Sequence, residues 1–150
     1  MQKIEPVNEK EIDWIRSQVE CAKTFVRDFA PVEEMPQLTL DKLDRAFAAW
    51  IFSNPIDAKS VNAIINCVGM AFGQILADGL NLSWVIASDD HGSELALHGL
   101  PASGDVLIYP ANFVAKRWER REINFFVDAY RRIARDVQAI TKKSQLIHPN

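Results

Sequence analysis

The spacing of hydrophobic residues changes twice along this 150-residue chain, from a helical period to a strand period and back. An apolar stripe that recurs every three to four residues predicts a helix, and strict alternation predicts a strand. The chain therefore reads as an α+β fold, organised as a single domain over residues 1–150. The predicted helices lie at about 8–29, 39–53, 60–78 and 110–141, and the strand region lies at about 82–109. Alternatively, residues 112–118 form a separate short helix before the last one.

The predicted helix at about 60–78 is the most informative of these elements. Its only ionised neighbours, Lys59 and Asp78, lie at its ends. A helix without a charged face is buried on most sides, so we expect it to be the central helix of the fold. Gly79 would then be its C-terminal cap.

Two amides and two glycines share one side of that central helix. Asn62 and Asn66 are one turn apart, next to Gly69 and Gly73. Because glycine has no side chain, we expect another segment to approach the helix closely there. The amides either bind backbone groups of that segment, which we favour, or line a pocket.

The strand region predicts a small three-stranded antiparallel β-meander, packed on the central helix with the other helices flanking it. Its strands would run over 82–87, 93–98 and 105–109, with Gly92 in the left-handed turn of the first hairpin. Alternation gives the sheet two faces. Toward the central helix we expect Leu95, Leu97, Val106 and Ile108. On the outer face we expect Glu94, His98, Asp105 and Tyr109, with His98 opposite Asp105 and Glu94 opposite Tyr109.

Composition narrows the class of protein. The chain is 48% hydrophobic and 25% charged, which is ordinary for a globular domain. Its longest dense apolar run, 46–52, is too short for a membrane span, and the N-terminus lacks the apolar core of a secretory signal. We therefore expect a cytoplasmic protein that does not bind membranes. Cys21 and Cys67 lie far apart in predicted helices, so we expect small core residues rather than a disulfide or metal site.

Charge is distributed unevenly along the chain. Residues 116–150 carry a net charge of +5, whereas residues 1–115 carry −8. The most basic stretch contains Lys116, Arg117, Trp118, Arg120 and Arg121. Four cations around an aromatic residue could bind phosphate or an acidic protein face. With a pI near 5.6, intramolecular pairing or a protein interface is favoured over nucleic acid.

The first hairpin is the second candidate for a functional site. Asp89, Asp90, His91 and Glu94 offer four metal-ligand types within six residues, but their spacing matches neither a calcium loop nor a zinc site. Asp, Asp and Gly are also what a tight turn uses, so we predict a plain turn and no metal or other cofactor. On the outer face, a His98–Asp105 pair could transfer protons, although no nucleophile or catalytic motif accompanies it.

Several short stretches resemble the family known as domain of unknown function 3806. The resemblance is carried by Gly69 to Gly73, Leu82 to Val85, Asp89 to Gly92, Asp105 to Pro110 and Lys116 to Glu119. Together they span 68–122 in the same order as in the family. The resemblance implies a bacterial, cytosolic domain, with no established activity to carry over.

These observations support one leading hypothesis and two alternatives. The leading one is a non-enzymatic protein-binding or regulatory module that uses the basic-aromatic segment 116–121, and an immunity-type partner of a toxin is one form of it. The second is a small-ligand or metal-binding protein, or an undetected enzyme, that uses the outer sheet face. The third is a homodimer with Trp14 or Trp50 at its interface.

Overall fold

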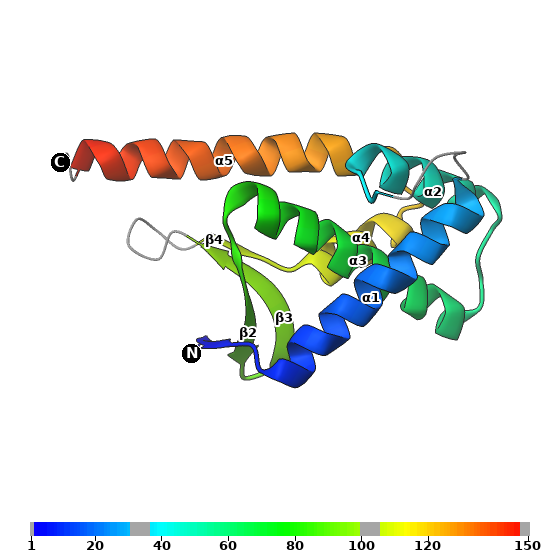
Figure 1. Ribbon diagram of the computed structural model, residues 1–150, viewed down its shortest axis with the longest axis horizontal. Coiled ribbons are helices and arrows are strands. Elements are labelled where there is room, and N and C mark those ends of the chain that lie inside the picture. The colour runs from blue at the N-terminus through cyan, green and yellow to red at the C-terminus, as the bar shows by residue number, and fades with distance from the viewer. Residues whose placement is uncertain (1, 31–36, 100–105, 148–150) are drawn as a thin grey trace.

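The structure is a computed structural model that describes residues 2–30, 37–99 and 106–147, with side chains through residue 142. Five helices and four strands occur in this described part, so the α+β class is confirmed. The helices are α1 (Glu9–Phe29), α2 (Leu40–Phe52), α3 (Ala58–Leu80), α4 (Pro110–Glu119) and α5 (Phe126–Ile147). The strands are β1 (Lys3–Pro6), β2 (Ser83–Asp89), β3 (Gly92–Gly99) and β4 (Val106–Ile108). The sheet lies at one end of the molecule, and α5 runs along one side of the helices (Figure 1).

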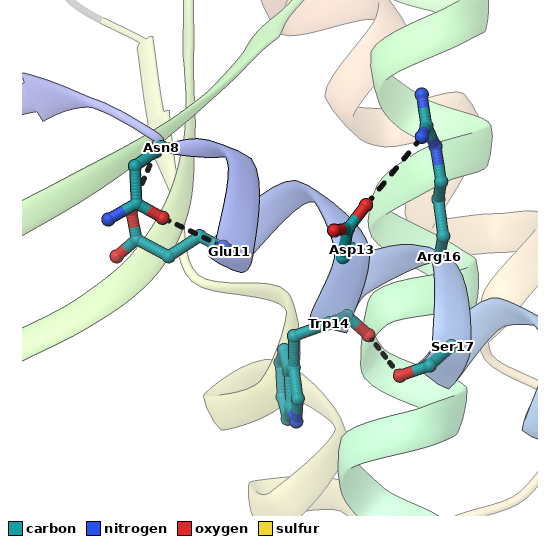
Figure 2. A network of polar contacts seen from close by, with 6 residues as sticks. All are labelled: Asn8, Glu11, Asp13, Trp14, Arg16 and Ser17. Carbon is teal, nitrogen blue, oxygen red and sulfur yellow. Dashed lines mark hydrogen bonds and ion pairs between the residues drawn. The ribbon is translucent and has the colours of Figure 1, made fainter.

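Helix α1 begins at the capping box that its sequence predicts. Asn8 Oδ1 accepts a hydrogen bond from the Glu11 backbone N–H at 2.8 Å, and Glu11 Oε1 accepts one from the Asn8 N–H at 2.8 Å (Figure 2). These bonds satisfy amides that the first turn of a helix leaves without partners. The apolar side of α1, with Ile15, Ala22, Phe25 and Val26 buried, packs against α3 and α2.

Helix α3 occupies the centre of the fold, as its lack of a charged face predicts. It packs against α1, α2, α4 and α5. By length and composition it is the one described helix that could also span a membrane, a property shared by buried core helices. The apolar run is therefore longer than we expected from sequence.

Gly69 and Gly73 of α3 allow the close approach that the sequence predicts. A Cβ on Gly69 would lie 2.8 Å from Ala111 Cα, and one on Gly73 would overlap the Trp84 ring. The approaching segments are thus the start of α4 and strand β2. The amides beside the glycines do not bind these segments, since Asn62 is exposed and Asn66 is only half-buried.

The prediction that Gly79 caps α3 is wrong. The helix continues to Leu80, and Asn81 is the C-terminal cap in the left-handed conformation, with φ 56°. Gly79 instead leaves room for Tyr130 of α5, whose hydroxyl group would overlap a Cβ at that position.

The sheet has four strands in the order β1-β2-β3-β4, all antiparallel, rather than the predicted three. The added strand, β1, is a four-residue edge strand ending at Pro6, too short to give a clear alternation. The β2–β3 turn forms where predicted, with Gly92 at φ 137° and Asp89 Oδ1 accepting from the His91 N–H at 2.8 Å.

The predicted register between the last two strands is wrong by two residues. His98 pairs with Leu107 and Leu97 pairs with Ile108, because β3 continues to Gly99 and β4 begins at Val106. A two-residue shift keeps each side chain on its predicted face but changes its neighbours. Leu97 and Val106 are accordingly buried in the main core.

Phenylalanine side chains join α2, α3, α4 and α5 in one core cluster. Neighbouring ring centroids lie 4.3 to 5.9 Å apart, mostly in edge-to-face or tilted pairs, the arrangement that aromatic rings favour. The members of this aromatic cluster are Phe47, Phe72, Phe113, Phe125 and Phe126.

Asp44 connects α2 to the start of α5. It is 8% exposed, and its two carboxylate oxygens accept hydrogen bonds from the backbone N–H groups of Phe126 at 2.7 Å and Val127 at 3.2 Å. A side chain of α2 thus caps the N-terminus of α5, 82 residues later in the chain. Burial raises the pKa of the Asp44 carboxyl, while the amide hydrogen bonds oppose that rise.

We expect Asp44→Ala to lower the free energy of unfolding by about 2 to 3 kcal/mol, because two buried amides lose their acceptor. Asp44→Asn keeps one acceptor oxygen and should cost less. Since the folded pKa is raised, the stability linked to Asp44 protonation is present below its unfolded pKa and is lost as pH rises through its folded pKa. The advantage of the wild type over Asp44→Asn should therefore be larger near pH 4 than near pH 7 in urea unfolding. An advantage that grows with pH would contradict this.

We expect Gly69→Ala to destabilise the fold by about 1 kcal/mol or more, although alanine is the better helix former. The added methyl would meet backbone atoms of Ala111, which cannot yield as a side-chain end can. Thermal unfolding of Gly69→Ala and of the exposed control Asn62→Ala measures the difference. A stabilised Gly69→Ala variant would show that α3 and α4 are not so closely packed.

Candidate functional site

The basic-aromatic segment lies at the C-terminal end of α4 and in the turn that leads to α5. Lys116, Arg120 and Arg121 are exposed, whereas Arg117 and Trp118 are half-buried. Residues 116 and 120 share one side of the helix, and residues 113 and 117 share another, as the helical repeat requires. The segment is therefore divided between the solvent and the core.

Arg117 belongs to the core side of the segment. Its guanidinium carbon lies 3.6 Å from the centroid of the Phe113 ring and 5.9 Å from that of Phe125, and its Nη1 donates to the Phe113 carbonyl at 3.3 Å. Its Nε lies 3.5 Å from a carboxylate oxygen of Glu122, outside hydrogen-bond geometry. Burial lowers the pKa of Arg117, Glu122 raises it, and the nearby cations Arg132 and Arg120 lower it.

The exposed cations of the segment have no acidic partner among the described residues. In the part of the chain that the structure describes, no carboxylate lies within 4.0 Å of Lys116, Arg120 or Arg121. The ion pair of this segment is that of Arg117 with Glu122. Intramolecular pairing, one of the two interpretations of the basic segment, therefore applies to Arg117 and not to its exposed neighbours.

Arg121 brings the basic segment against the loop between α2 and α3. Its φ is 54°, its guanidinium lies 4.8 Å from the Trp118 ring centroid, and its Nη1 donates to the Pro55 carbonyl at 3.4 Å. Phe52 and Ile56 flank this contact in sequence and are 76% and 80% exposed. We name these two residues with Lys116, Arg120 and Arg121 the cationic–apolar surface.

Sequence reasoning missed the apolar part of this surface. Phe52 lies two residues after the buried Trp50, about 200° around the helix, and so points away from the buried stripe of α2. Ile56 follows Pro55 in a loop and belongs to no stripe. The available signal in the sequence was Phe52, a large apolar residue that lies outside the apolar stripe of its helix.

The outer face of the sheet is largely closed. Val85, Ala87 and Ala96 are buried there, with Ile4, Leu107 and Tyr109 packed on them. The Tyr109 hydroxyl accepts a hydrogen bond from Gln2 Nε2 at 2.7 Å, which joins the chain before β1 to the chain after β4. The sheet therefore curves so that its two edges approach across this face.

The predicted outer-face site is only partly present in the described residues. Glu94 is exposed, and desolvation together with Asp89 raises the pKa of its carboxyl. His98 is half-buried on the same face and pairs with Leu107. Asp105 lies outside the described residues, so its predicted proximity to His98 stays untested, although the register places Leu107 opposite His98. Among the described residues, no group of three His, Cys, Asp or Glu could hold a metal ion.

The remaining candidates lie on α1, α2 and α3. Trp14 is 39% exposed and stands out from the helix (Figure 2), whereas Trp50 is buried, so Trp50 cannot contribute to a dimer interface. Cys21 is exposed, contrary to expectation, and Cys67 is buried as predicted, with its thiol pKa raised by burial to about 12. Trp14, Cys21, Asn66 and Cys67 line a groove of about 500 Å³ between α1 and α3.

Comparison with known proteins gives one match. The family described as Domain of unknown function (DUF3806) matches residues 42–130, from the first turn of α2 to the first turns of α5. The match includes Asp44, the aromatic cluster and the whole cationic–apolar surface. No curated protein and no solved structure matches the chain.

We expect the two sides of the basic segment to respond differently to substitution. Arg117→Ala should lower the free energy of unfolding by about 1 to 2 kcal/mol, because the stack on Phe113 and the Glu122 pair are lost together. The matched control Arg120→Ala should change it by less than about 0.5 kcal/mol. Urea unfolding followed by fluorescence measures both, and equal effects would contradict the division of the segment.

Proposed function

The chain belongs to the family of domain of unknown function DUF3806, and from that premise we propose that it acts as a non-enzymatic protein-binding module. Its binding surface is the cationic–apolar surface. One observation carries the proposal: Phe52 and Ile56, the two most exposed large hydrophobic residues among those described, lie on either side in sequence of Pro55, whose carbonyl accepts a hydrogen bond from Arg121.

Exposed apolar side chains rimmed by polar groups are typical of protein interaction sites. Interfaces are enriched in arginine and aromatic residues, and a few of these carry most of the binding free energy. Phe52 and Ile56 supply apolar area, and Lys116, Arg120 and Arg121 supply donors without an acidic partner among the described residues. The two parts are complementary components of one interface.

The backbone under this surface is fixed by short-range contacts. Arg121 and Asn54 both have positive φ, at 54° and 56°, and the Ser53 and Asn54 amides close the end of α2 by donating to carbonyls of its last turn. A preorganised surface loses less conformational entropy on binding. The exposed free thiol of Cys21 supports a reducing, cytosolic setting for the module.

Selection of a displayed random-peptide library on the folded protein tests the proposal. We expect selected peptides to bind the double variant Phe52→Ser/Ile56→Ser at least about tenfold more weakly than the wild type. Its thermal stability should stay unchanged, because both side chains are already exposed.

Trp14→Ser is the matched control, since Trp14 is an exposed aromatic residue on a different helix face. Peptides that lose affinity for Trp14→Ser but not for the Phe52/Ile56 variant would assign binding to the α1–α3 groove. The cationic–apolar surface would then be the wrong one.

A further inference from the structure

Three arginines continue the cationic surface from α4 onto α5. Arg131, Arg132 and Arg135 are exposed on the first half of the helix. Within the described residues, none of them lies within 4.0 Å of a carboxylate. Together with Tyr130 and Gln138, they line a hollow of about 690 Å³ that also includes Asp128.

Electrostatic coupling ties this hollow to the basic segment of α4. Arg132 and Arg120 both act on the half-buried guanidinium of Arg117 as like charges, and Glu122 is the acid that opposes them. Arg132 of α5 and Arg120 of α4 therefore both lie near Arg117. Cations that gather on one surface create a positive potential, which attracts negative groups.

We infer that the partner of this module presents an acidic protein segment, whose carboxylates enter the arginine-lined hollow beside α5 while its apolar side chains cover Phe52 and Ile56. This inference rests on the proposed function and specifies its partner. Arginine guanidinium groups bind carboxylates through two parallel hydrogen bonds, so Arg131 and Arg135 select for acidic side chains. Apolar contact at Phe52 and Ile56 supplies affinity that charge alone does not.

A protein segment fits this site better than a membrane or a nucleic acid. Residues 1–115 carry a net charge of −8, so an extended anionic surface would repel most of the molecule. A short acidic segment meets only the local cations.

The test uses the peptides selected as above, each with a copy in which every Asp and Glu is replaced by Asn or Gln. Fluorescence anisotropy should show the amide copies binding at least about tenfold more weakly than the parents, with parental affinity falling as salt rises. The variant Arg131→Glu/Arg135→Glu should weaken the parents by a similar factor and leave the amide copies unchanged.

Lys10→Glu/Arg27→Glu is the matched control, because it reverses two exposed cations of α1 for which the described residues show no ion pair. It should leave parental affinity within about twofold of the wild type. Circular dichroism and thermal unfolding of both double variants confirm that each is folded.

The outcomes separate the two proposals. Selected peptides that bind Phe52→Ser/Ile56→Ser as tightly as the wild type would overturn the proposed function itself. Peptides that depend on Phe52 and Ile56 but tolerate both amide replacement and Arg131→Glu/Arg135→Glu would overturn the acidic partner and leave the module intact. Stronger, Arg131-dependent binding to phosphatidylserine vesicles or to a single-stranded DNA oligonucleotide than to any peptide would also overturn it.

Discussion

The carboxylate of Asp44 is the interaction on which the arrangement of the C-terminal half depends. Helix α5 begins at Phe126, and its first amides point at Asp44 of α2 rather than at a cap from its own sequence. A buried anion at a helix N-terminus satisfies orphan amides and interacts favourably with the helix dipole. Its cost is desolvation, and the raised pKa of Asp44 reflects that burial outweighs the amide hydrogen bonds in setting its protonation.

The aromatic cluster forms where this cap places the start of α5. Phe125 and Phe126 flank the capped amides and contact Phe47, one turn after Asp44 on α2. Phe126 also reaches Phe72 of α3, and Phe125 reaches Phe113 of α4. A single carboxylate thus fixes the position at which four helices meet, and Arg117 then lies on the outer side of Phe113.

Sequence periodicity predicted most of the elements and little of how they meet. The helices, the hairpin and the buried α3 follow from local patterns, because each pattern reflects one face of one element. The fourth strand and the register of β4 were not predicted, since pairing depends on loops between elements. Asp44 was also missed: a carboxylate in the helical stripe of α2 reads as a surface charge until α5 is in place. The basic segment was found from charge, but its division between Arg117 and Arg120 depends on the position of Phe113.

The same geometry explains why this segment is both part of the fold and exposed to solvent. On α4, Phe113 and Arg117 lie one turn apart and face the aromatic cluster, while Lys116 and Arg120 lie one turn apart and face solvent. Arg117 holds a half-buried positive charge that Glu122 only partly balances, and Arg120 and Arg132 lie close enough to repel it. Like charges held together by a rigid core repel one another, and a carboxylate brought in by another molecule relieves that repulsion. If the proposed acidic partner binds here, it should therefore stabilise the fold at a place where like charges gather around Arg117.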